Sequence, residues 1–169
     1  MLVRKVLKTP VTLLALLALA LFAAAWGWDN ARRPIPPRPP EPCHWITVGP
    51  HFTPDHAIIR VLNATGDNGV ARRVAAVLRA SGFRVIKVGN ADANENGVRV
   101  VGVAPNSPEV VLTLGQFEKP KVVADQRPDH TVDIFVGKGY ALKAKPLASV
   151  PVKDGRACVP VLPSGATSG

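Results

Sequence analysis

The stretch LNATGDNGVARR, at positions 62–73, contains residue types that proteins use to bind anions. Its candidate binding residues are Asn63, Gly66, Asp67, Asn68, Gly69, Arg72 and Arg73. A β-branched run precedes the stretch and an apolar periodic segment follows it, so we expect a turn leading from a strand into a helix. Such a helix would present unpaired N–H groups at its N-terminus, and the two arginines add positive charge one turn later. The stretch therefore predicts a site for an anionic group.

A purely structural role accounts for the same residues. The Asn63 side chain can bond to the turn backbone, and Gly66 and Gly69 permit positive φ. Either Asp67 or Asn68 can cap the helix. The glycine spacing does not match the G-x-G-x-x-G pattern of dinucleotide-binding proteins, and the Lys-Ser/Thr of a P-loop is absent. We expect no nucleotide and no other cofactor, while the anion site and the plain turn both remain open.

The other reactive side chains form no recognisable catalytic or metal-binding pattern. The histidines lie in predicted loops or lead-in segments without ligand spacing: His44, His51, His56 and His130. One predicted turn gathers several titratable residues, namely Asp125, Asp129, His130 and Asp133. Asp is a routine turn former, and no serine lies on a G-x-S-x-G elbow. The sequence predicts no catalytic residue and no metal site, and we expect the protein not to be an enzyme.

The two cysteines, Cys43 and Cys158, bracket the segment that we expect to fold. In an exported protein such a pair favours a disulfide, which would close a long loop and stabilise the fold. Two free thiols or intermolecular pairs are the alternative. A zinc site is not predicted, because two isolated cysteines lack the spacing of ligand pairs.

The N-terminal region predicts export. Positions 1–8 read as a basic cytoplasmic tail, and positions 9–28 read as a transmembrane signal-anchor that ends in Trp26 and Trp28. A cleaved signal peptide with a site at Ala23–Ala25 is the alternative. Either segment would place the rest of the chain outside the cytoplasm. Positions 29–42 are proline-rich and predict a stiff polyproline stalk.

The rest of the chain predicts one small α/β (α+β) domain. After a lead-in at 43–56, positions 57–145 alternate short apolar strands with two helices, in the order β-α-β-β-α-β-β. The strands are expected at 57–63, 83–90, 98–103, 120–125 and 131–137, and the helices at 68–82 and 108–114. The right-handed crossover rule predicts a small mixed sheet with both helices on one face. We expect positions 146–169 to form an irregular tail that is disordered after Cys158.

The segment IIRVLNATGDNGVARRVAAVLRASGFRVIKVGNAD and the later DQRPDHTVDIFVGKGY together resemble the LytR C-terminal domain of exported, especially actinobacterial, envelope proteins. The resemblance covers Ala57 to Tyr140. In that family the domain often follows a LytR-CpsA-Psr phosphotransferase, which attaches glycopolymers to peptidoglycan. Here the stalk and lead-in alone separate Trp28 from Ala57, a layout that resembles the actinobacterial envelope-integrity proteins called Cei. The resemblance carries over only three turn residues, Asn63, Gly66 and Gly69, and the second helix looks shortened.

Three functions remain open at this stage. The first is a non-catalytic, membrane-anchored envelope module that binds an anionic cell-wall glycopolymer or an envelope protein and supports envelope integrity. The second is an accessory subunit that regulates a separate phosphotransferase. The third is a nucleic-acid binder, suggested by the net charge of +9, but export argues against it and we expect no nucleic-acid partner.

Overall fold

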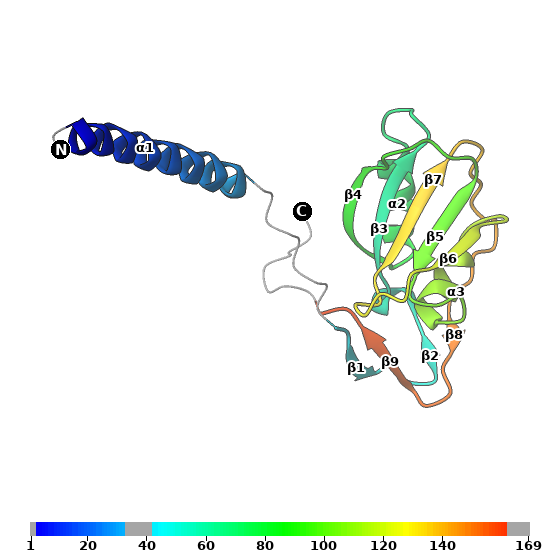
Figure 1. Cartoon of the computed structure of the whole chain (residues 1–169). Coiled ribbons are helices and arrows are strands. Elements are labelled where there is room, and N and C mark those ends of the chain that lie inside the picture. The colour runs from blue at the N-terminus through cyan, green and yellow to red at the C-terminus, as the bar shows by residue number, and fades with distance from the viewer. Residues whose placement is uncertain (1–2, 33–41, 162–169) are drawn as a thin grey trace. The chain divides into compact units, whose positions relative to one another are not determined.

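The computed structural model describes residues 3–32 and 42–161 (Figure 1). The chain forms two compact units, Met1–Pro39 and Pro40–Gly169. Most of the predicted stalk, at 33–41, lies outside the described residues. The same holds for residues 1–2 of the predicted basic tail and for 162–169 of the predicted disordered end.

The first unit contains one long helix, α1 (Val3–Ala31), which includes Pro10. Its segment Pro10–Trp28 has a mean hydropathy of 2.1 and is long and apolar enough to cross a membrane. A signal sequence near an N-terminus has the same length and apolar character. The helix continues three residues past the predicted end of the span, and the Arg32 guanidinium lies 4.5 Å from the centre of the Trp28 ring.

The second unit is built on a five-stranded mixed sheet in the order β4-β3-β7-β5-β6. The strands are β3 (Ile58–Ala64), β4 (Arg84–Asn90), β5 (Val98–Gly102), β6 (Lys121–Ala124) and β7 (Val132–Gly137). Strand β3 is parallel to both β4 and β7, β5 is parallel to β6, and β5 is antiparallel to β7. All five predicted strands are present, and the predicted mixed sheet is confirmed.

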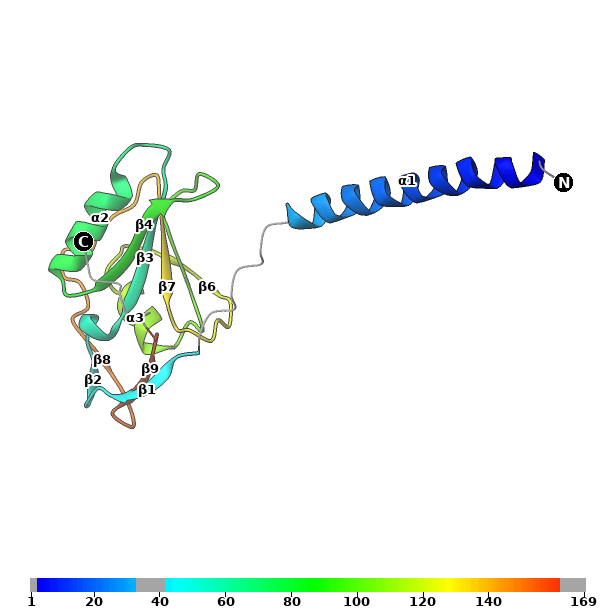
Figure 2. The ribbon, with the colours of Figure 1, turned by 90° about the vertical axis from the view of Figure 1, so that its left-hand side faces the viewer.

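Two helices cover one face of this sheet, as predicted (Figures 1 and 2). Helix α2 (Val70–Ala80) connects β3 to β4, and α3 (Pro108–Leu114) connects β5 to β6. Both contribute to one core with alternate residues of the strands, including Ile59 and Val61 of β3 and Ile134 of β7. Helix α3 has the predicted bounds: Ser107 is its N-cap, Pro108 lies in its first turn and Gly115 is its C-cap.

Two local features depart from the expected apolar patterns. The buried stripe of α2 is Val70, Ala71, Val74, Ala75 and Leu78, whereas Val77, an apolar residue seven positions after Val70, is 46% exposed. A stripe centred on those residues leaves position 77 at its margin. In β4, Val85 pairs with Ile59 but Lys87 pairs with Arg60, so a bulge at Ile86 breaks the alternation.

The segments on either side of the predicted domain are ordered and paired with each other. The lead-in forms β1 (His44–Thr47), β2 (His51–Phe52) and the short 3-10 helix η1 (Pro54–His56). The tail forms β8 (Val150–Pro151) and β9 (Arg156–Val159). Strand β1 pairs with β9 and β2 with β8, both antiparallel, in two small ribbons seen below the sheet in Figure 1.

These ribbons correct the expectation of an irregular tail. Phe52, Ala157 and Val159 belong to the hydrophobic core, with Phe52 only 1% exposed. The tail is therefore part of the fold as far as β9, because its apolar residues complete the core at the end of the domain. Val159 extends this order one residue past Cys158.

Candidate binding site at the N-terminus of α2

The turn between β3 and α2 is organised by Asn63, the sixth residue of β3. Its Nδ2 donates to the carbonyl oxygen of Asp67 at 2.8 Å, and its Oδ1 accepts from the backbone N–H of Thr65 at 3.1 Å. The Thr65 hydroxyl also donates to Oδ1, at 2.7 Å, and it accepts from the Asp67 N–H at 3.0 Å. The predicted structural role of Asn63 is confirmed, because its side chain holds the turn closed.

The two glycines of the turn adopt the left-handed conformation that was predicted for them. Gly66 has φ +82° and Gly69 has φ +79°. Gly69 itself is the N-cap of α2, without a side-chain cap. The prediction that Asp67 or Asn68 caps the helix is wrong: the backbone reverses at Gly69, which leaves both side chains exposed before the cap.

A depression of about 360 Å³ lies where this turn meets the end of β4. It is lined by Asn63, Asn68, Gly69, Ala71, Arg72, Val88, Gly89 and Asn90. Four predicted site residues thus come together here: Asn63, Asn68, Gly69 and Arg72. The other three, Gly66, Asp67 and Arg73, are not among the lining residues, although the Arg73 side chain lies against Gly69.

Sequence reasoning missed the contribution of β4 to this depression. Asn63 and Asn90 are register partners at the carboxyl ends of the parallel strands β3 and β4. In α/β sheets this edge, together with the N-terminus of the connecting helix, is where ligands commonly bind. The strand–helix–strand pattern was visible in the sequence, so the end of the second strand could have been included on that rule alone.

The chemistry of the depression suits an anion. The N-terminus of α2 carries a partial positive charge, and its first N–H groups have no acceptor within the helix. Arg72 is exposed at the rim, and the amides of Asn63, Asn68 and Asn90 offer further donors. The lining contains no carboxylate among the described residues, which removes an obvious source of repulsion.

Comparison with known proteins assigns the domain. The family described as LytR cell envelope-related transcriptional attenuator matches residues 57–140, which contain the whole five-stranded sheet, both of its helices and the depression. Residues 57–140 form a LytR C-terminal domain. The family points to an envelope-associated module. Among curated proteins, none matches the chain.

A solved structure resembles part of this chain. It is the soluble domain of a conserved hypothetical secreted protein from Mycobacterium marinum, 20% identical to this chain, with a TM-score of 0.47. The match covers 59% of this chain and 79% of the solved chain.

Outside the depression, the LytR C-terminal domain holds its acidic turn residues in local bonds. Arg127 pairs with Asp125 and with Asp133, and Asp129 accepts from the N–H and the hydroxyl of Thr131. The hydrogen bond from Arg127 lowers the pKa of Asp125 below its usual value. Each of these carboxylates thus has a partner that explains its position in the turn.

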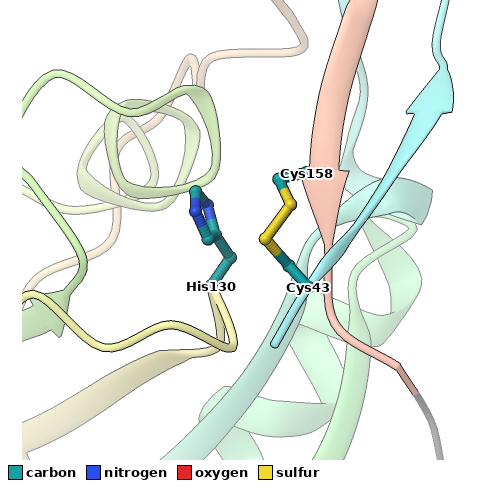
Figure 3. Close-up of side chains that lie close together, drawn as sticks. All are labelled: Cys43, His130 and Cys158. Atoms are coloured by element: carbon teal, nitrogen blue, oxygen red, sulfur yellow. A yellow bond between two sulfur atoms is a disulfide. The ribbon is translucent and has the colours of Figure 1, made fainter. Parts of the chain in front are cut away.

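His130, from the same turn, faces the junction of the domain with the β1–β9 ribbon. Cys43 and Cys158 form the predicted disulfide, with 5.4 Å between their Cα atoms. A ring nitrogen of His130 lies within 4.8 Å of both sulfur atoms, and Figure 3 shows the imidazole beside the disulfide. Its Nδ1 lies 2.8 Å from Oε1 of Glu109 on α3. Both sulfurs are bonded to each other, and a zinc site would instead need thiolates.

Proposed function

We propose that this protein is a non-catalytic, extracytoplasmic envelope module that binds an anionic cell-wall polymer in the depression at the N-terminus of α2. In this role it supports the integrity of the envelope. The observation that carries the proposal is the convergence of Arg72, the first N–H groups of α2 and two asparagines, Asn63 and Asn90, on one open depression.

The type of ligand follows from the shape and chemistry of this depression. The depression is partly open to solvent, as suits one repeat of a long polymer rather than an enclosed small molecule. Backbone N–H groups at a helix N-terminus and an adjacent arginine are the common protein ligands of phosphate and carboxylate groups. Asparagine side chains add donors and acceptors for sugar hydroxyls. An anionic glycopolymer offers both kinds of group.

The proposed location rests on the N-terminal segment. Helix α1 has the length and hydropathy of a membrane span, with cations on its N-terminal side. As an anchor it would hold the LytR C-terminal domain on the outer side of the membrane, within reach of the wall. The family's association with the cell envelope supports the same placement.

Sedimentation with isolated wall fractions tests the proposal. Full-length protein in detergent micelles should sediment with a wall fraction that retains its anionic polymer, and less with a fraction stripped of that polymer. Arg72→Glu should weaken binding by about tenfold or more, because it replaces a charge-assisted donor with a repelling carboxylate. Lys145→Glu, an equal charge reversal at an exposed position away from the depression, should bind like the wild type.

The possible outcomes separate the functions. Equal loss in both variants would show unspecific charge attraction and contradict the site. If sedimentation does not depend on the polymer and the protein instead retains a phosphotransferase from a membrane extract, the result would favour the role of a regulatory subunit. Turnover of a wall substrate by the purified protein would contradict the non-catalytic role.

A further inference from the structure

The junction between α3, the β6–β7 turn and the β1–β9 ribbon contains a buried carboxylate with an unsatisfied oxygen. Glu109 is 2% exposed, and its Oε1 contacts Nδ1 of His130. Its Oε2 is buried without a hydrogen-bond partner among the described residues. An unsatisfied buried carboxylate oxygen is costly, so the position of Glu109 calls for a reason beyond packing.

The backbone at this point is strained as well. His130 has φ +54°, in the left-handed region, which is unfavourable for a residue with a side chain. The turn is held in place from the ribbon, because the Cys43 N–H donates to the carbonyl oxygen of Pro128 at 3.0 Å. Strained residues of this kind concentrate at functional sites. In this conformation the His130 ring contacts Glu109 on one side and lies beside the disulfide.

The other charged groups of the turn are engaged elsewhere. Asp129 bonds to Thr131, and Arg127 bonds to Asp125 and Asp133. Glu109 from α3 is therefore the one charged group with a described contact to His130. A carboxylate, an imidazole and a sulfur in sequence form the arrangement by which proteins orient a histidine and stabilise a thiolate.

We propose that Cys43–Cys158 is a site of thiol–disulfide exchange with a dithiol reductant, in which His130 serves as the acid for the departing sulfur and Glu109 positions its ring. Cys43 is half-buried, whereas Cys158 is 6% exposed, so the attacking thiolate reaches the Cys43 sulfur. This proposal concerns a different part of the domain from the α2 depression and does not depend on polymer binding.

The exchange proceeds in two balanced steps. A thiolate of the dithiol forms a new S–S bond to Cys43, the Cys43–Cys158 bond breaks, and its electron pair leaves on the Cys158 sulfur. That sulfur, which lies within 4.8 Å of a ring nitrogen of His130, takes a proton from the imidazolium. The second thiolate of the reductant then attacks the mixed disulfide and releases Cys43. The dithiol is oxidised by two electrons, and the two cysteines are reduced.

The kinetics of reduction test this proposal. Full-length oxidised protein in detergent micelles is treated with dithiothreitol, and released thiols are alkylated and counted by mass spectrometry. His130→Ala should slow reduction by about tenfold, because the leaving thiolate loses its acid. His44→Ala, which removes the exposed histidine next to Cys43, should leave the rate unchanged. The disulfide of the Glu109→Gln variant should be reduced more slowly than that of the wild type but faster than that of His130→Ala.

A merely structural role for His130 makes the opposite prediction. Removing the ring opens the junction, so a disulfide that is only shielded by His130 would be reduced faster in His130→Ala. An unchanged or faster rate in that variant overturns the proposal, and so does equal slowing in His44→Ala.

The pH dependence of the reduction rate is a second test, and it uses the wild-type protein alone. The rate constant, divided by the concentration of dithiothreitol thiolate, should fall as pH rises through the range in which histidines titrate, because the acid is lost. A flat profile between pH 5 and pH 8 overturns the proposal, as does a disulfide that resists dithiothreitol until denaturant is added.

Discussion

Arg60 on β3 and Asp133 on β7 are register partners on neighbouring parallel strands, and they form a two-point salt bridge on the sheet face that the helices leave uncovered. Arg60 Nη2 lies 2.9 Å from Asp133 Oδ2, and Nε of the same guanidinium contacts Oδ1. Arg127 Nη1 reaches Oδ2 as well, at 3.1 Å. One carboxylate thus joins two strands and the turn that precedes β7.

Replacing this carboxylate should destabilise the domain measurably. The Asp133 side chain is 13% exposed, so its salt bridge is intermediate between two classes. Exposed salt bridges contribute about 0–1 kcal/mol to stability, and disruption of buried ones costs about 3–5 kcal/mol. Asp133→Asn should therefore lower the free energy of unfolding in urea by about 2 kcal/mol. Asp92→Asn, at an exposed loop position, is the matched control and should change it little. Equal values for the two variants would contradict the role of the bridge.

A second ion pair on the same face predicts how stability depends on pH. Hydrogen bonding and charge attraction from Arg99 lower the pKa of Glu95 below its usual value of 4.5, and the Arg99 guanidinium lies 3.8 Å from the centre of the Phe135 ring. A lowered folded-state pKa stabilises the fold above pH 4.5, and this contribution is lost as pH falls through the folded value.

Glu95→Gln should remove that contribution. The variant should be less stable than the wild type at pH 7, by less than about 1 kcal/mol for a partly exposed pair, and the gap should close towards pH 3. Urea unfolding at several pH values measures it, with Glu118→Gln at an exposed position as the control. A gap that is constant with pH would show that the ion pair is not its source.

The disulfide should contribute strongly to stability because it closes a long loop. Cys43 and Cys158 are separated by 115 positions, for which the chain-entropy model gives about 5 kcal/mol. The Cys43→Ser variant should unfold at a lower urea concentration than the oxidised wild type, and the reduced wild type should behave like the variant. Identical melting temperatures of the wild type with and without reductant would contradict this prediction.

The central domain could be predicted from sequence because its signals are local. Each strand of the five-stranded sheet is a run of β-branched residues, and α2 has a clear apolar periodicity. The helix predicted at 108–114 is α3 with the same bounds, because Pro108 favours the first turn of a helix through its own backbone. The order of the strands was not predicted, because the pairing of β7 between β3 and β5 depends on contacts distant in the sequence.

The ribbons were missed for the same physical reason. Strands β2 and β8 have two residues each, too short for any alternation, and Pro151 lies within β8. They form because the disulfide, the core residue Phe52 and the partner strand act together. Similarly, the contact between Glu109 and His130 joins positions 21 apart through a left-handed turn residue, which no residue spacing indicates.

Substitutions of Gly69, in the turn before α2, separate a role in backbone conformation from a role in ligand binding. Gly69 has φ +79°, and a Cβ built there would meet only Arg73 Nη1, at 3.5 Å, so a side chain has space but the backbone conformation opposes it. Gly69→Val should therefore lower the free energy of unfolding by about 1–2 kcal/mol, whereas Gly69→Asn should lower it less, because Asn enters the left-handed region more readily. Equal stability of the two variants would show that the turn relaxes to another conformation. If Gly69→Val folds normally but no longer sediments with the polymer-containing wall fraction, the glycine serves the ligand rather than the fold, since the helix N–H groups then lie behind the new side chain.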